Sequence, residues 1–146
     1  MTMTKRLACL GLCLCVPWAA LATAPTKPPA NDLPADCTKA DTQRHLNACA
    51  YADFEVAQAG YAAVFRDLSA GVDSAQRTLL RTAQTAWLQY RTAACDFEAS
   101  GVRGGSAEPM VRMQCQSRMT RTRTAELRRH LACPEGDLSC VRPAPK

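Results

Sequence analysis

Six of the nine cysteines in this 146-residue chain limit its possible folds more than any other feature. They are Cys37, Cys49, Cys95, Cys115, Cys133 and Cys140. An even number of cysteines in an exported chain favours disulfides over free thiols. A metal site is the alternative, but the chain has no Cys-x-x-Cys pair, and His45 and His130 lie far from a ligand spacing. We therefore expect a small domain stapled by disulfides, with no metal site.

The other three cysteines lie within a segment that is typical of an export signal. Lys5 and Arg6 precede the apolar run Leu7–Val16, which is too short to span a bilayer. Small residues near its end predict cleavage after Ala22, so residues 1–22 form the predicted signal peptide. The sequence thus predicts a periplasmic or secreted protein that has no stable membrane span once the signal is removed.

The part that remains after cleavage is large enough for one domain. The 146 residues less the 22 of the signal leave 124, which can bury a single hydrophobic core. Loss of Lys5 and Arg6 lowers the formal net charge from +5 to +3, which is too weak to indicate a nucleic-acid partner. Residues 23–36 contain four prolines and predict a flexible leader, and residues 133–146 form a second Pro-rich end with its own cysteine pair.

Between these ends, apolar side chains recur at helical spacing in three segments. The first predicted helix spans residues 38–69, the second spans 74–99, and the third runs from Ser106 to about Leu131. The expected N-caps are Asp41 or Thr38, then Asp73 or Ser74, then Ser106. No alternating strand pattern competes. The prediction is an all-α fold, an antiparallel three-helix bundle stapled by disulfides, with disordered Pro-rich ends.

The same spacing predicts which faces of the later helices point inward. In the second helix the expected apolar stripe is Leu80, Ala83, Trp87, Tyr90, Ala94 and Phe97. In the third it is Val111, Cys115, Met119, Leu127 and Leu131, with Arg123 in one rung. Antiparallel packing brings the first four of the six cysteines to one end of the bundle, and the last two flank a Pro/Gly turn. The pairing stays open among the fifteen possibilities that six cysteines allow.

Several motifs in the helical region match a pattern of bacterial envelope proteins. The motifs are CTKADTQRHLNACAYADFEVA, AQTAWLQYRTAACDFEA, GGSAEPM and CQSRMTRTRTAELRRHL. Together they resemble the LprI-type lysozyme inhibitor domain, and the domain expected from this resemblance spans residues 37–132. The resemblance implies a protein that inhibits c-type lysozyme by non-covalent binding and that needs no cofactor. The chain departs from the family pattern at His45 and Leu46 and in its Cys133/Cys140 tail.

The turn between the second and third helices is the candidate binding site, and it consists of Arg103, Gly104, Gly105 and Ser106. Glycines carry no bulky side chain, so an exposed turn of this kind can approach an active-site cleft closely. Arg103 can reach a carboxylate there. Ser106 lacks the Gly-x-Ser-x-Gly context and the preceding strand of a nucleophile, so we expect a binding protein without catalytic residues and not an enzyme.

Polar residues on the helices form a predicted structural cluster. Its members are Asn47, Asp53, Gln84, Trp87, Arg91 and Arg123. Gln84, Trp87 and Arg91 lie on one face of the second helix, because they are three and four residues apart. We expect Arg91 and Arg123 to find carboxylate or carbonyl partners, since a buried guanidinium without partners is costly.

The arginines of the third helix raise a second functional hypothesis. They are Arg112, Arg118, Arg121, Arg128 and Arg129, and together they would form a basic surface. Such a surface suits an anionic glycan such as peptidoglycan, although a solvated helix face is the simpler interpretation. A positive net charge also disfavours attraction to lysozyme, which is itself cationic. The alternative function is therefore an envelope structural or peptidoglycan-binding module without inhibitor activity, and the expected partner is lysozyme, another envelope protein or peptidoglycan.

Overall fold

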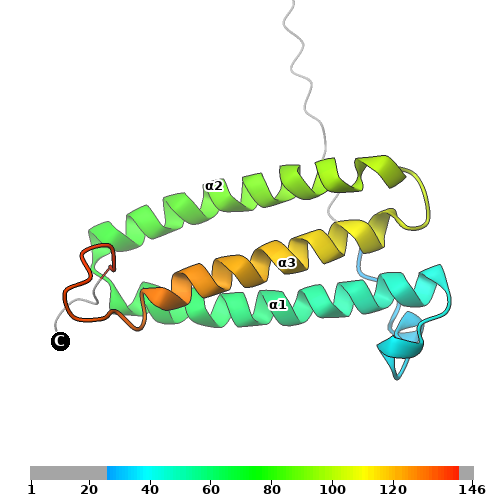
Figure 1. Ribbon diagram of the computed structural model, residues 1–146, viewed down its shortest axis with the longest axis horizontal. Coiled ribbons are helices and arrows are strands. Elements are labelled where there is room, and N and C mark those ends of the chain that lie inside the picture. The colour runs from blue at the N-terminus through cyan, green and yellow to red at the C-terminus, as the bar shows by residue number, and fades with distance from the viewer. Residues whose placement is uncertain (1–25, 142–146) are drawn as a thin grey trace, which may run out of the picture.

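Three long helices account for most of the fold (Figure 1). The protein is represented by a computed structural model, which describes residues 26–141. The long helices are α1 (Gln43–Gly71), α2 (Ser74–Glu98) and α3 (Glu108–Arg129). Short 3-10 helices precede and connect them, namely η1 (Ala30–Asp32), η2 (Cys37–Lys39) and η3 (Ala99–Val102). Residues 26–141 contain no strand, and the prediction of an all-α three-helix bundle is confirmed.

Some sequence predictions concern residues outside this range. The predicted signal peptide of residues 1–22, the first three residues of the predicted leader and the last five of the predicted tail lie outside the described residues. The rest of the leader includes η1, so part of it is a helical turn. The domain boundaries at residues 22, 36 and 132 stay predictions.

The structure corrects the start of α1. Its N-cap is Thr42, whose Oγ1 accepts a hydrogen bond from the His45 N–H at 3.2 Å, and not Asp41 or Thr38. Thr38 belongs to η2, where its N–H donates to the Asp36 carboxylate at 2.9 Å. The cap lies later than predicted because this separate turn uses the preceding residues.

The other two helix starts differ in how well the sequence predicted them. Asp73 caps α2 as expected, and it forms a reciprocal capping box with Gln76. The predicted cap of α3 is wrong, because α3 begins at Glu108 after Ala107, and Ser106 accepts no capping hydrogen bond. The Ser106 carbonyl instead accepts a hydrogen bond from Asn47 Nδ2 at 3.0 Å, which holds that residue against α1.

The core lies mainly between α1 and α3, which pack closely, whereas α2 stands further away (Figure 1). The buried apolar cluster consists of Tyr61, Val64, Leu68, Val72 and Leu127, with Phe65 and Leu80 packed against it. The gap at the N-terminal half of α2 contains a cavity of about 330 Å³ that is lined by leucines of all three helices.

The predicted inward face of α2 is correct for Leu80 and Trp87, which pack against the core and against Tyr61, and wrong for Tyr90 and Phe97. Tyr90 is 64 % exposed and Phe97 is 82 % exposed, whereas the buried residues of α2 are Gln84, Arg91 and Cys95. The cause is a rotation of the helix about its axis: Cys95 must face α3 to form its disulfide, and Phe97, two residues later, then points about 160° away from Cys95.

The predicted inward face of α3 is correct in part. Cys115 and Leu127 are buried as expected, whereas Leu131 is 40 % exposed. Leu131 lies beyond the last residue of α3, so helical spacing no longer governs its direction.

Three disulfides staple the bundle, and they join Cys37 to Cys49, Cys95 to Cys115 and Cys133 to Cys140. The first two lie at the end of the bundle where α1 begins and α2 passes into α3 (Figure 1). The third closes a small loop after α3, at the opposite end. The disulfides thus hold both ends, and only Cys95–Cys115 links two long helices directly.

We expect the three disulfides to differ in their effect on stability. The Cys95–Cys115 bond closes a loop of 20 residues, so replacing both cysteines with serine should lower the free energy of unfolding by about 3 kcal/mol. The Cys133–Cys140 bond closes only 7 residues outside the helices, so the same change there should cost less, about 2 kcal/mol, and leave the helix content unchanged. Urea unfolding followed by far-ultraviolet circular dichroism measures both. A larger loss for the Cys133/Cys140 variant would contradict this ranking.

Candidate functional site

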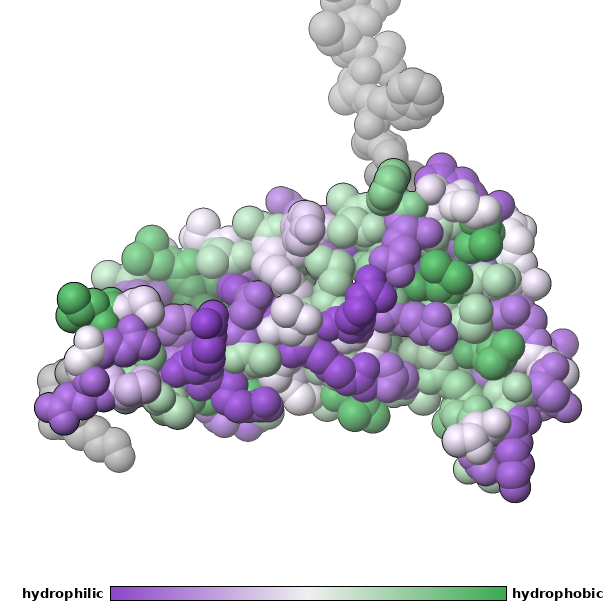
Figure 2. Space-filling model, in the orientation of Figure 1, coloured by the Kyte–Doolittle hydropathy of each residue, from purple (hydrophilic) through white to green (hydrophobic). Residues whose placement is uncertain are grey.

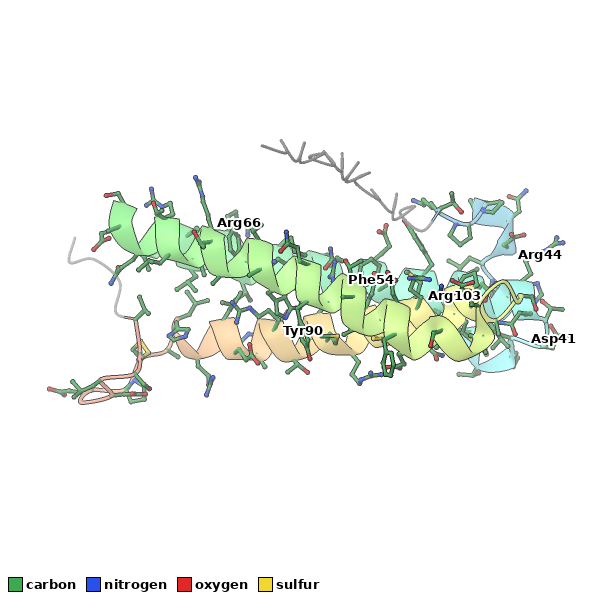
Figure 3. The ribbon with its side chains drawn as sticks, turned by 90° about the horizontal axis from the view of Figure 1, so that it is seen from above. Asp41, Arg44, Phe54, Arg66, Tyr90 and Arg103 are labelled. Carbon is green, nitrogen blue, oxygen red and sulfur yellow. A yellow bond between two sulfur atoms is a disulfide. The ribbon has the colours of Figure 1, made fainter. Side chains whose placement is uncertain are left out.

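The turn from Arg103 to Ser106 protrudes at one end of the bundle, and all four of its residues are exposed. Figure 3 labels Arg103 at the end that also carries Asp41 and Arg44. Gly104 has a φ of +75°, a backbone conformation that L side chains rarely adopt. At Gly105, a Cβ would lie 3.1 Å from the Val102 carbonyl oxygen. The backbone conformation therefore favours glycine at position 104, and a side chain at position 105 would crowd the Val102 carbonyl.

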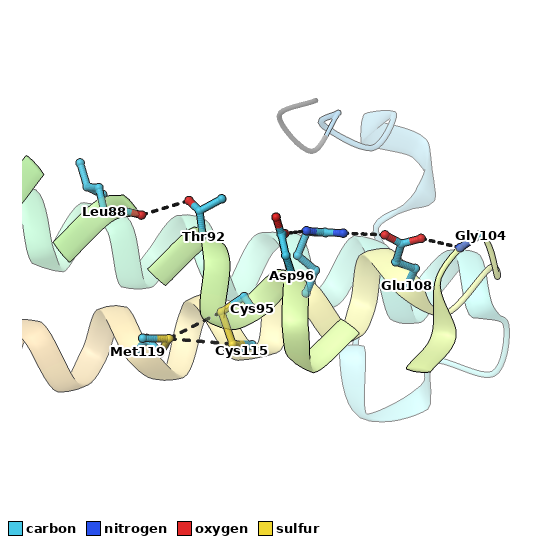
Figure 4. A network of polar contacts seen from close by, with 9 residues as sticks. Leu88, Thr92, Cys95, Asp96, Gly104, Glu108, Cys115 and Met119 are labelled. Atoms are coloured by element: carbon cyan, nitrogen blue, oxygen red, sulfur yellow. Dashed lines mark hydrogen bonds and ion pairs between the residues drawn. A yellow bond between two sulfur atoms is a disulfide. The ribbon is translucent and has the colours of Figure 1, made fainter. Parts of the chain in front are cut away.

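A chain of polar contacts fixes the turn to α3 and α2 (Figure 4). The Gly104 N–H donates to Glu108 Oε2 at 2.6 Å, and Glu108 Oε1 accepts from the Arg112 guanidinium at 2.5 Å. Arg112 also forms an ion pair with Asp96 of α2. Because the disulfide between Cys95 and Cys115 lies beside this chain of contacts, the base of the turn is held covalently as well.

Contacts with α1 and η3 complete the attachment of the turn. Asn47 of α1 donates to the Ser106 carbonyl, and the Gly105 N–H donates to the Val102 carbonyl at 3.0 Å. Side chains of α1 and α3 thus hold the turn directly, and Asp96 of α2 supports it through Arg112. The Arg103 guanidinium forms no ion pair with any of residues 26–141. The arrangement is a rigid, exposed turn that ends in one unpaired cation.

A second polar site lies inside the bundle, around Arg91. Its guanidinium donates to Gln58 Oε1 of α1 and to Thr120 Oγ1 of α3, both at 2.8 Å. It also lies 5.3 Å from the ring centroid of Phe54 and 5.0 Å from that of Trp87. Burial disfavours the charged form of Arg91 and so lowers its pKa. No carboxylate within residues 26–141 pairs with the charge. The aromatic faces take the place of a counter-ion.

Tyr61 of α1 lies next to the Arg91 guanidinium. Its ring stacks against Trp87 with the centroids 5.8 Å apart, and it packs against Phe65 at 5.7 Å. Its hydroxyl is buried and has no hydrogen-bond partner among residues 26–141. Burial raises the pKa of Tyr61 to about 12, which the positive charges of Arg123 and Arg91 offset only in part. Tyr61 therefore stays a neutral phenol well above its ordinary titration range.

The six residues of the predicted polar cluster do not lie together. Trp87 and Arg91 are in contact, but Asn47 holds the exposed turn at the end of the bundle. Asp53 accepts from Ser117 and Arg121 of α3. The two remaining residues have no partner in the cluster: Gln84 is buried without a protein partner among residues 26–141, and Arg123 donates to Glu126 at 3.0 Å.

Sequence reasoning did not predict the roles of three residues that complete these two sites. Gln58 and Thr120 bind Arg91; Thr120 lies in the motif CQSRMTRTRTAELRRHL, but neither residue stands out in the apolar pattern. Glu108 connects Gly104 to Arg112. The spacing of Glu108 and Arg112, four residues apart, is a signal that could have indicated their ion pair.

The expected basic surface on α3 is largely neutralised. Arg112 pairs with Asp96 and Glu108, and Arg118 pairs with Glu98 at 2.7 Å. Arg121 binds both oxygens of the Asp53 carboxylate, and this contact holds the pKa of Asp53 below its ordinary value. The face that α3 presents is hydrophilic along its middle (Figure 2). Only Arg128 and Arg129, of the five arginines considered, lack an ion pair with another described residue.

No helix within residues 26–141 is long and apolar enough to cross a membrane. Likewise, among residues 26–141, no three or more His, Cys, Asp or Glu side chains gather in a way that could hold a metal ion.

The fold and the turn define a class of small, disulfide-stapled helical domains with a rigid exposed loop at one end. Comparison with known proteins identifies the family. The family described as lysozyme inhibitor LprI matches residues 35–127, and the chain belongs to this family. The uncharacterized protein R02472 of Rhizobium meliloti (strain 1021) is 36 % identical over 106 residues, which cover 64 % of this chain and 76 % of that protein. No solved structure matches the chain.

We expect Arg91 to be the polar side chain on which stability depends most. Arg91→Ala leaves Gln58 and Thr120 without their shared donor, so it should lower the free energy of unfolding by about 1–3 kcal/mol. Arg91→Lys should recover only part of this, because an ammonium group cannot place two donors in a planar fork between two rings. The exposed Arg81→Ala is the control and should stay within about 0.5 kcal/mol of the wild type. Equal losses for Arg91→Ala and Arg81→Ala would contradict the structure.

A pH dependence follows from Tyr61. Because its pKa is higher in the folded state than in the unfolded state, its contribution to stability is complete below about pH 10 and is lost as the pH rises toward about 12. Tyr61→Phe should remove that part of the alkaline loss and cost less than about 1 kcal/mol at neutral pH, since the hydroxyl lacks a protein partner. Unfolding by urea at about pH 8 and about pH 11 measures both effects. The exposed Tyr90→Phe is the matched control, and an alkaline loss that both variants share would refute the role of Tyr61.

Proposed function

We propose that this protein inhibits a c-type lysozyme by non-covalent binding, in the periplasm or outside the cell, and that the Arg103–Ser106 turn enters the cleft of the enzyme. The observation that carries the proposal is the rigid, exposed turn with a free guanidinium, in a chain of the LprI family. A pre-organised loop loses little conformational entropy on binding, so more of its contact energy contributes to affinity.

The chemistry of the turn fits the cleft of a glycosidase. Such a cleft carries a pair of carboxylic groups on opposite sides of the scissile bond. A guanidinium is the side chain that best matches a carboxylate, because it donates two parallel hydrogen bonds. Gly104 and Gly105 keep the turn narrow, so Arg103 can approach these carboxylates without a clash from neighbouring side chains.

The net charge of the chain opposes this contact only modestly. Loss of Lys5 and Arg6 with the proposed signal peptide leaves 16 basic against 13 acidic side chains, a formal net charge of +3. This small excess slows association with a cationic enzyme at long range, and the local contact of Arg103 with a carboxylate acts in the opposite direction.

The disulfides support the proposed export, and the ion pairs of α3 bear on the alternative function. Three disulfides persist in an oxidising compartment such as the periplasm or the extracellular space. The hypothesis of a peptidoglycan-binding module gains less support, because three of the five α3 arginines are paired with carboxylates and so have little charge left for an anionic glycan.

The test compares inhibition of c-type lysozyme by the wild type and by Arg103→Ala with Ser106→Ala. We expect the double change to weaken inhibition by about tenfold or more, the loss typical of a central interface residue. Added salt should strengthen inhibition by the wild type, because salt screens the repulsion between a chain of net charge +3 and a cationic enzyme.

A matched double variant, Arg128→Ala with Ser74→Ala, controls for general effects. It removes the same two side-chain types from exposed positions at the opposite end of the bundle, and it should inhibit like the wild type. No inhibition by the wild type would refute the proposed function and leave the envelope module as the better description. Inhibition that is unchanged in Arg103→Ala with Ser106→Ala would refute the role of the turn alone.

A further inference from the structure

An apolar stripe runs along an exposed face of α2, and its residues Leu79 and Ala83 also line the edge of the cavity beside the N-terminal half of the helix. It consists of Leu79, Ala83, Ala86, Tyr90, Ala93 and Phe97, and all six residues are exposed. The successive spacings are four, three, four, three and four, the alternation of a helix that packs along another helix. Leu79 is 70 % exposed, and Tyr90 and Phe97 are exposed to a similar degree or more. We call this set the α2 stripe.

The residues beside the α2 stripe are also unusual for a solvated surface. No lysine, arginine or glutamate lies within the stripe, and one flank carries Thr78, Thr82, Thr85 and Gln89. Each of these threonines donates its hydroxyl to the carbonyl four residues earlier, at 3.0–3.1 Å. Their polar groups are therefore satisfied within the helix, and the flank can lose water at little cost. A helix face that is meant for water normally carries charged residues instead.

We propose that the α2 stripe is the interface of a homodimer in which the α2 helices of two copies pack antiparallel. A two-fold axis between Ala86 and Tyr90 pairs every residue of the stripe with another residue of the stripe. Leu79 then lies opposite Phe97 of the second copy, Ala83 opposite Ala93, and Ala86 opposite Tyr90. Each tyrosine thus faces an alanine at the centre of the contact, and the large residues Leu79 and Phe97 meet at its two ends.

A parallel pair would place the same side chains badly. Tyr90 would face Tyr90, Phe97 would face Phe97, and every alanine would face an alanine. At the centre of the contact, two tyrosines would then hold the helices apart and leave voids beside the neighbouring alanines, which the antiparallel pair avoids because it places Tyr90 against Ala86.

The size and charge of the stripe fit a second copy of this chain. The exposed parts of Leu79, Tyr90 and Phe97 in two copies, together with the alanines, amount to about 1,000 Å², near the lower limit for a specific interface. An uncharged stripe brings no like charges together when two identical chains meet. The antiparallel pair leaves both Arg103–Ser106 turns free at opposite ends of the dimer, so this proposal does not depend on the proposed function.

Sedimentation equilibrium of the purified, oxidised protein tests the dimer. We expect the wild type to associate in the micromolar range, as a small interface allows. Ala83→Lys with Ala93→Lys should raise the dimer dissociation constant by about tenfold or more, because lysines would face lysines. Ala83→Lys with Ala93→Glu should dimerise close to the wild type, because each lysine then faces a glutamate of the second copy.

A matched control and a folding check separate these effects from unfolding. Ala59→Lys with Ala62→Lys adds the same charge to exposed positions of α1 and should leave the dimer unchanged. Far-ultraviolet circular dichroism verifies the helix content of each variant. A wild type that is monomeric up to millimolar concentration would overturn the proposal and assign the stripe to a different partner. A dimer that survives Ala83→Lys with Ala93→Lys would overturn the stripe as the interface, and equal dissociation of both α2 variants would overturn the antiparallel register.

Discussion

The position of α2 depends on one buried guanidinium. Arg91 extends from α2 to Gln58 on α1 and to Thr120 on α3, and it lies between the rings of Phe54 and Trp87. Arg91 and the two rings fill more space between α2 and the other helices than alanine or leucine side chains would. This explains why α1 and α3 pack closely while α2 stands further away, with a cavity beside its N-terminal half. A charge that hydrogen bonds hold from two sides also specifies one alignment of the three helices, which an apolar contact would do less strictly.

The exposed turn lies at the end of the bundle where additional contacts hold α2 close to α3. Near the turn, α2 and α3 are joined by the Cys95–Cys115 disulfide and by the ion pairs of Arg112 with Asp96 and Glu108. Covalent and ionic contacts replace the apolar packing that α2 lacks. A loop on a loosely packed helix pair would sample many conformations, whereas this loop is attached to the most constrained part of the molecule. The Asn47 contact extends the attachment to α1.

Sequence patterns predicted the number of helices, their approximate bounds and the convergence of four cysteines, because apolar spacing and turn residues are local signals. They did not predict the rotation of α2. Tyr90 and Phe97 fit a helical stripe with Leu80 and Trp87, and they fit equally well a stripe with Leu79 that points outward. The choice between the two is made by Arg91 and Cys95, whose inward direction depends on partners far away in the sequence. The pairing of the α3 arginines is non-local in the same way, so a basic surface was expected where the structure has ion pairs.

The rotation of α2 links the two surfaces that we propose to bind partners. If Cys95 faces α3, then α2 presents Phe97 to the outside, and the same disulfide fixes the base of the Arg103–Ser106 turn. One set of inward contacts thus holds the turn at the end of the bundle and directs the α2 stripe to its side. Because a helix buries only one face against a two-helix layer, the large apolar residues of α2 divide between the inward side, with Leu80 and Trp87, and the exposed side, with Tyr90 and Phe97. Arg91 and Cys95 occupy the rest of the inward face, and the exposed bulk of Tyr90 and Phe97 is the part that the proposed homodimer covers.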